Sequence, residues 1–269
     1  MLKHYHTRIH FSYKTSATIH FYSSIIAALS LTLLLVISFK FFAPINLFEY
    51  RSVSLFDICL ASFLTLVRLS LSYVMALLVA LPLAVAVTSH PRLERFFLPI
   101  FDILQSVPVL AFFPVIVLLF MKFNLFEWSA IFILFMSMVW VLIFSMVAGI
   151  KTIPAEIKDV AEIFKFTGFK KLKFITIPAI FPYIVTGSLI AWGAGWNVII
   201  VAEAIHTYIP SGTSSDDLFG IGSLLVNSAY QNNSILFLST LVVMVLIISL
   251  MNFFIWQKLL RISERYKFD

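Results

Sequence analysis

The sequence predicts an all-α protein that crosses a membrane about six times. Hydrophobic residues make up 61% of its 269 residues and charged residues only 12%, whereas about a quarter of the residues in soluble domains are charged. The mean hydropathy is correspondingly high, at +1.01. The apolar residues also form long runs of roughly 20 residues, which is the length that a helix needs to cross about 30 Å of hydrocarbon.

Six apolar runs have this length, and each is predicted to be one spanning helix. They lie at residues 21–42, 58–88, 99–121, 128–150, 179–205 and 234–257. The second run is longer than a bilayer requires, so we expect its helix to tilt strongly or to begin at the membrane surface. Pro108 and Pro114 predict kinks in the third run, where freed carbonyl groups could also line a cavity.

The polar connections are short. The longest, at about 43–57, 151–177 and 206–233, cannot bury a hydrophobic core of their own, so no soluble domain is expected. Within the last connection, the segment that begins at Gly220 and Gly222 predicts a short helix that turns back toward the membrane. We therefore divide the chain into a tail (1–20), a first helix with its outer loop (21–57), a core (58–257) and a second tail (258–269).

The fifth run carries a repeat of small residues, because Gly187, Ala191 and Gly195 recur every four positions. Small residues at this spacing allow the backbone of a neighbouring helix to approach closely. The repeat therefore predicts helix packing on that face.

Basic residues are distributed unequally between the two predicted sides of the membrane. Fifteen of the 19 lie on one side, at Lys3, Arg8, Lys14, Arg92, Arg95, Lys151, Lys158, Lys165, Lys170, Lys171, Lys173, Lys258, Arg261, Arg265 and Lys267. Cytoplasmic loops carry such an excess. We therefore expect both termini and the loop at 151–177 to be cytoplasmic, and the net charge of +6 needs no nucleic-acid partner.

Several kinds of active site are excluded by the residue content. The chain has one cysteine, Cys59, which we expect to be a buried, unreactive thiol, and its six histidines show no metal-ligand spacing. His4, His6 and His10 could bind a metal, but a solvated tail is the favoured interpretation. No glycine-rich phosphate loop is present, so we expect neither a bound cofactor nor nucleotide hydrolysis on this chain.

The loop at 151–177 is an amphipathic interruption between two apolar runs. Its helix is predicted to begin at Pro154, a favoured residue at a first helical position, and to end near Gly168. One face is apolar, and polar side chains surround it; the apolar residues are Ile157, Val160, Ala161 and Phe164, and the charged ones include Lys158, Asp159 and Glu162. Such a helix can dock into a hydrophobic groove on a partner, or it can lie on an anionic lipid surface.

This loop resembles the cytoplasmic signature loop of ATP-binding-cassette importer permeases. Asp159-Val160-Ala161 stands in place of Glu-Ala-Ala, and Ile175-Thr176-Ile177-Pro178 in place of Ile-x-Leu-Pro, with the family's step of nineteen residues between Asp159 and Pro178. Lys165 occupies the position of the family's glycine. The resemblance extends over roughly residues 58–260 and includes Gln105-Ser106-Val107-Pro108 and Trp196-Asn197. Within this class, the sequence is most similar to the nitrate, sulfonate and taurine branch, and within that branch to the anion permeases in which two such modules are fused in one long chain.

The resemblance implies a type I importer permease fold in a bacterial inner membrane and an alternating-access pathway for a small anion. The implied partners are two cytosolic ATPase subunits that bind ATP and Mg²⁺, a second permease subunit and an extracytoplasmic substrate-binding protein. The implied docking residues for the ATPase are Ile157, Lys158, Asp159, Val160, Ala161, Glu162, Phe164 and Gly168.

Charged residues inside the spans are the remaining candidates for function, because each is costly to place in hydrocarbon. Arg68 is predicted either to attract an anion or to pair with Asp102 or Glu203, and we favour pairing. Trp196, Asn197 and Glu203, with Arg68, are the predicted residues of the substrate pathway. The alternative function is a gradient-driven transporter or channel, but such carriers usually contain internal repeats, and we detect none.

Overall fold

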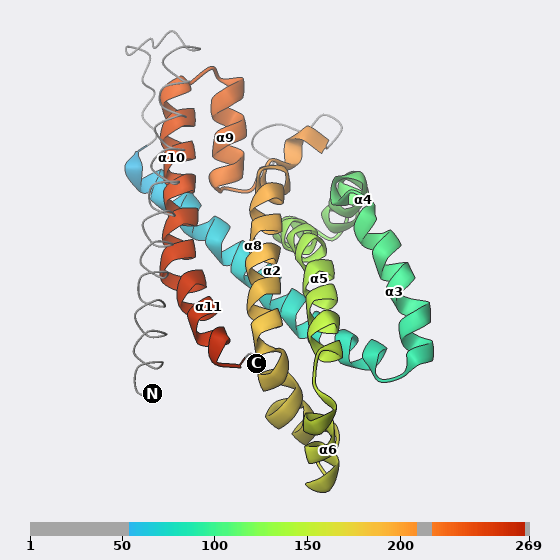
Figure 1. The fold of residues 1–269 in the computed structure, drawn as a ribbon. Coiled ribbons are helices and arrows are strands. Elements are labelled where there is room, and N and C mark those ends of the chain that lie inside the picture. Colours follow the sequence, from blue (N-terminus) through green and yellow to red (C-terminus); the bar gives the residue numbers. More distant parts are fainter. Residues whose placement is uncertain (1–53, 209–216, 267–269) are drawn as a thin grey trace, which may run out of the picture.

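The computed structural model describes residues 54–208 and 217–266, and all regular elements in these ranges are helical (Figure 1). The first predicted span, 21–42, lies outside them. The α-helices are α2 (Leu55–Thr88), α3 (Pro91–Ser106), α4 (Val109–Met121), α5 (Phe126–Lys151), α6 (Ala155–Ile163), α7 (Gly168–Lys171), α8 (Ile177–Glu203), α9 (Ile221–Tyr230), α10 (Ser234–Met251) and α11 (Gln257–Ser263). Shorter helical turns are η1 (Leu172–Thr176), η2 (Ile205–Tyr208), η4 (Asn252–Trp256) and η5 (Glu264–Tyr266).

Four predicted spans are confirmed as helices that are long and apolar enough to cross a membrane. They lie at Leu55–Thr88, Phe126–Lys151, Gly168–Glu203 and Ser234–Tyr266. The third and fourth are continuous because π-helical turns, η1 and η4, join α7 to α8 and α10 to α11. The predicted short helix after Gly220 is also confirmed, as α9.

The prediction of one kinked helix at 99–121 was wrong. Instead, α3 and α4 are separate helices that meet at an angle of 84°. Pro108 cannot donate a backbone hydrogen bond and disfavours a helical conformation in the residue before it, so Val107 is extended, with φ −74° and ψ 123°. Pro114, in contrast, remains inside α4.

The long second span is one helix that runs at an angle to the other spans. With 34 residues, α2 is about 51 Å long at a rise of 1.5 Å per residue, well beyond the thickness of the hydrocarbon core. Figure 1 shows it running obliquely across the direction of α8 and α10. Its first turn is fixed by a capping box, in which Ser54 accepts from the amide of Phe56 and Asp57 accepts from that of Ser54.

The centre of the bundle is the contact between α5 and α8. Gly187, Ala191 and Gly195 are buried on α8, which confirms the predicted packing face. A Cβ atom built on Gly187 would lie 2.6 Å from Cβ of Ser145 on α5, and one built on Gly195 would overlap the side chain of Met138. The absence of these Cβ atoms therefore allows the two backbones to approach.

We predict that Gly187→Ala lowers the free energy of unfolding by about 1–3 kcal/mol, because the added methyl group would overpack the contact with Ser145. Gly193→Ala is the matched control on the same helix, since no atom lies within 4 Å of its Cβ position. Alanine is the better helix former by about 1 kcal/mol, so the control should be neutral or stabilising. Denaturant unfolding of the detergent-solubilised chain, followed by circular dichroism, measures both. Equal losses would contradict the packing argument.

Candidate functional site

The loop between α5 and α8 projects from one end of the bundle, with α6 as its outermost helix (Figure 1). Pro154 precedes α6, which spans Ala155–Ile163, so the predicted start is accurate to one residue. The loop is thus a distinct helical element beyond the main bundle.

The end of α6 differs from the prediction. Its last turn closes at Lys165, not at Gly168, because Lys165 takes the left-handed conformation with φ 52° and the amide of Phe166 donates to the carbonyl of Ala161 at 2.8 Å. This bond is the 6→1 bond of a Schellman motif. Gly168 is also left-handed, with φ 54°, and it begins α7.

The predicted docking residues do not share one exposed face. Ile157 packs against the core and Ala161 is 1% exposed, so this side of α6 rests on the protein itself. Asp159, Ile163 and Phe164 are exposed, the last two at 76% and 66%. The side chains of Lys158, Val160 and Glu162 lie outside the described residues. The surface that α6 offers to a partner therefore includes Asp159, Ile163 and Phe164.

Aromatic rings extend this surface toward α8. Phe164 stacks on Phe166 with ring centroids 6.0 Å apart, and Phe166 stacks on Phe174 at 6.1 Å. The ammonium group of Lys173 lies 5.5 Å from the centroid of Phe174, within the range of a cation–π interaction. The loop thus carries a solvent-facing surface that is both apolar and basic.

A buried charged cluster lies at the other end of the bundle, where α2, α5, α8 and α9 meet. Arg68 of α2 makes a bidentate contact with Glu127, at 2.6 and 2.8 Å, and a 2.8 Å bond with Glu203. It also donates to the carbonyl of Phe219 at 3.0 Å. Arg68 is 4% exposed, so its guanidinium group contacts these protein acceptors and little solvent.

Glu203 connects this cluster to the start of α9. Its carboxylate accepts from the hydroxyl of Thr65 at 2.8 Å and from the amide of Gly222 at 2.7 Å. A Cβ atom on Gly222 would lie 2.6 Å from the carbonyl oxygen of Ile199, so only glycine permits this approach. The negative carboxylate also lies at the N-terminal turn of α9, where a helix dipole favours an anion.

Arg68 and Glu203 therefore pair with one another, as we favoured, whereas Asp102 is exposed on α3 and hydrogen bonds to Gln105. The second partner of Arg68, Glu127, was missed. It lies just before the predicted fourth span, and its sequence gives no signal that it meets α2. The two other predicted pathway residues are adjacent on α8 but differ in exposure. Trp196 is buried in the core, at 7% exposed, whereas Asn197 is exposed.

No group of three or more His, Cys, Asp or Glu residues that could hold a metal ion occurs in the described ranges. His4, His6 and His10 lie outside them. His206 contacts Asp217 at 2.7 Å, and Asp217 also accepts from Asn227 of α9. The prediction that Cys59 is buried was wrong, because it is exposed on α2.

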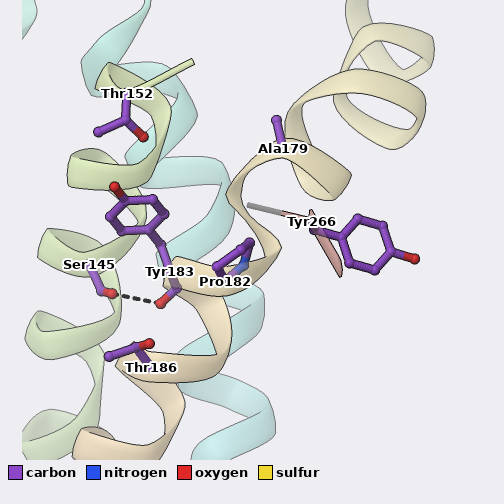
Figure 2. A pocket seen from close by; sticks show the side chains of 7 residues that line it. All are labelled: Ser145, Thr152, Ala179, Pro182, Tyr183, Thr186 and Tyr266. Carbon is purple, nitrogen blue, oxygen red and sulfur yellow. Dashed lines mark hydrogen bonds between the residues drawn. The ribbon is translucent and has the colours of Figure 1, made fainter. Parts of the chain in front are cut away.

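A cavity of about 380 Å³ lies between α5 and α8, near the base of the loop. Figure 2 shows Ser145 of α5 and Thr152, the residue that follows α5, opposite Tyr183 and Thr186 of α8, whereas the ring of Tyr266 points away from them. Ser145 donates to the carbonyl oxygen of Tyr183 at 2.7 Å. The residues that line the cavity are Ser145, Thr152, Ala179, Pro182, Tyr183, Thr186 and Tyr266.

Comparison with known proteins supports the resemblance of the chain to importer permeases. The chain is 29% identical over 159 residues to the nitrate import permease protein NrtB of Leptolyngbya laminosa, covering 59% of this chain and 56% of the relative. It is 33% identical over 168 residues to the bicarbonate transport system permease protein CmpB of Synechocystis, covering 62% and 55%. For the taurine transport system permease protein TauC of Escherichia coli, identity is 28% over 141 residues, covering 52% and 50%.

The matched part of this chain thus spans about half the length of these curated relatives. A family model covers more of this chain, at residues 72–261, which include the second half of α2, the bent pair α3 and α4, the loop and most of the last span. The chain therefore belongs to the family of binding-protein-dependent transport system inner membrane components.

Proposed function

We propose that this chain is the membrane permease subunit of an ATP-driven importer that receives its cargo from a substrate-binding protein. The observation that carries the proposal is the projecting loop with its exposed apolar surface, in a chain of the permease family. The chain itself binds no nucleotide in this proposal. ATP and Mg²⁺ bind to two separate ATPase subunits, and a second permease subunit, identical or paralogous, completes the pathway.

The distribution of charge supports an inner-membrane location with the loop in the cytoplasm. The starts of α3 and α6 lie toward the same end of the bundle as α11 in Figure 1, and these segments carry Arg92, Arg95, Lys170, Lys258 and Arg261 in or next to them. Cytoplasmic ends of spanning helices carry such an excess of basic residues. The charged cluster around Arg68 then lies near the outer surface.

The cargo class follows from the relatives, whose names specify nitrate, bicarbonate and taurine. Each of these substrates bears a negatively charged oxygen-containing group, so we propose a small oxyanion or sulfonate as the cargo. The rival function, a gradient-driven carrier, gives no role to a projecting loop whose aromatic residues remain in solvent.

We predict that Ile163→Asp abolishes co-purification with the ATPase and ATP-driven uptake. Ile163 is 76% exposed, so the substitution should leave the bundle folded. Burial of one such side chain contributes about 1.5–3 kcal/mol, and the new carboxylate adds a desolvation cost, so docking should weaken by a factor of 10 or more. Ala161 is unsuitable for this test because it is buried against the bundle.

Phe123→Asp is the matched control for Ile163→Asp. Phe123 is 63% exposed, and it lies in the turn between α4 and α5, at the opposite end of the bundle from the loop. This variant should retain ATPase binding and transport. Normal ATP-coupled uptake by the Ile163→Asp variant would exclude the docking assignment.

We also predict that Arg68→Met destabilises the chain by about 3–5 kcal/mol, because it leaves the fully buried carboxylate of Glu203 without its cation. Glu127→Gln should cost much less, since that side chain is 55% exposed. The double variant Arg68→Met/Glu203→Leu should recover most of the lost stability. If Arg68→Met keeps wild-type stability in denaturant unfolding and loses only uptake, Arg68 contacts the cargo instead.

A further inference from the structure

The described membrane-spanning helices offer no free positive charge to an anion in their inner turns. Arg68 is the cation placed there, and four hydrogen bonds commit it to Glu127, Glu203 and the carbonyl of Phe219. The other cationic side chains of these helices lie at helix ends or in the loop. Within the described helices, an anionic cargo therefore meets neutral groups.

One face of α8 supplies such groups. Its exposed residues Thr186, Ile190, Gly193 and Asn197 recur at steps of three and four and therefore form one stripe. Many exposed residues of the other spans are large and apolar, as at Leu78 of α2, although Ser70 of α2 and Asp102 and Gln105 of α3 are exposed as well. An amide without a hydrogen-bond partner costs several kcal/mol in hydrocarbon. Asn197 therefore indicates that the α8 stripe faces water or polar groups, not lipid tails.

The stripe leads to the cavity between α5 and α8. Thr186, its end nearest the loop, is one of the lining residues, about 17 Å along the helix from Asn197. Ser145 and Thr152 already donate to the carbonyl oxygens of Tyr183 and Gly149, at 2.7 and 2.9 Å. The hydroxyl groups of Tyr183 and Thr186 have no hydrogen-bond partner among the described residues, so both are available to a ligand.

The cavity is also held in shape before any ligand arrives. The ring of Tyr183 lies directly over Gly149, where an added Cβ atom would be 2.8 Å from it. Figure 2 shows the bond from Ser145 that fixes the backbone of Tyr183 beside the cavity. A preorganised site loses less conformational entropy when it binds a small molecule.

We propose that this cavity is a cargo site of the permease, in which the neutral hydroxyl groups of Tyr183 and Thr186 donate hydrogen bonds to a small oxyanion. The inference rests on the proposed function and names residues for it. Neutral donors bind an anion less tightly than a buried cation would, which suits a site that must also release its cargo. The cavity lies between Thr152 at the end of α5 and Ala179 near the start of α8, so a movement of the loop alters its shape.

The first test removes one hydroxyl group at a time in the assembled importer, reconstituted in liposomes with its ATPase and binding protein. Nitrate, bicarbonate and taurine serve as probes. Thr186→Val and Tyr183→Phe should each lower the uptake rate about tenfold at a subsaturating probe concentration, because each removes a hydrogen bond to the charged cargo. Thr186→Ser keeps the hydroxyl and should restore uptake. Thr88→Val is the control, because the Thr88 hydroxyl bonds to its own helix at 2.7 Å.

The second test uses the single native cysteine, since Cys59→Ser gives a cysteine-free background. In that background, Thr186→Cys should react with a water-soluble, anionic thiosulfonate reagent, and the transported anion should slow this reaction severalfold. Leu246→Cys on the apolar exposed side of α10 should not react.

The outcomes separate this inference from the proposed function. If wild-type liposomes import a probe with ATP but the hydroxyl variants match wild type and the anion gives no protection, the cavity assignment is wrong and the permease function stands. If wild-type liposomes import none of the three probes, the proposed function fails, and the cargo site fails with it.

Discussion

The close approach of α5 and α8 is the constraint on which the rest of the structure depends. Two glycine contacts along this pair bring side chains of the cavity into place. Gly187 of α8 allows Ser145 of α5 to approach, and Gly149 of α5 leaves room for the ring of Tyr183 of α8. The two helices carry the α5–α8 loop at one end and contribute Glu127 and Glu203 to the charged cluster at the other. A change in their separation at the loop end therefore alters the loop and the cavity together.

The two ends of this helix pair are held very differently. At the cluster end, one guanidinium group connects α2 to α5 and α8, and Glu203 also binds the first turn of α9. Removing one partner from such a buried network costs several kcal/mol, so this end resists opening. At the loop end, an ion pair joins Lys151 of α5 to Glu94 of α3, and both side chains are partly exposed. Exposed pairs contribute about 0–1 kcal/mol. Force applied to α6 would therefore move the loop end and leave the cluster as the fixed point.

Local patterns in the sequence predicted the four described spans, the small-residue packing face and the projecting helix, because apolar length and periodicity are properties of neighbouring residues. The errors concern interactions between distant segments or the conformation of single residues. Glu127 looked like a loop residue because its partner, Arg68, lies 59 positions away. The break at Val107 required knowledge of how far Pro108 bends the chain, and Ala161 could be assigned to an inward face only once α6 was placed against the bundle. The docking and pathway residues stay predictions.

The charge balance of the cluster bears on how an anion could pass. Two carboxylates, Glu127 and Glu203, surround one guanidinium group, and Glu203 is fully buried. Such a cluster has no excess positive charge with which to trap an anion, and Asn197 lies less than two turns before Glu203 on α8. A cationic site here would hold the cargo tightly, and each transport cycle would then have to supply the energy to release it. Neutralising Arg68 internally removes that barrier. In the proposed importer, selectivity then comes from the shape of the pathway and its hydroxyl and amide groups, together with the affinity of the proposed substrate-binding protein.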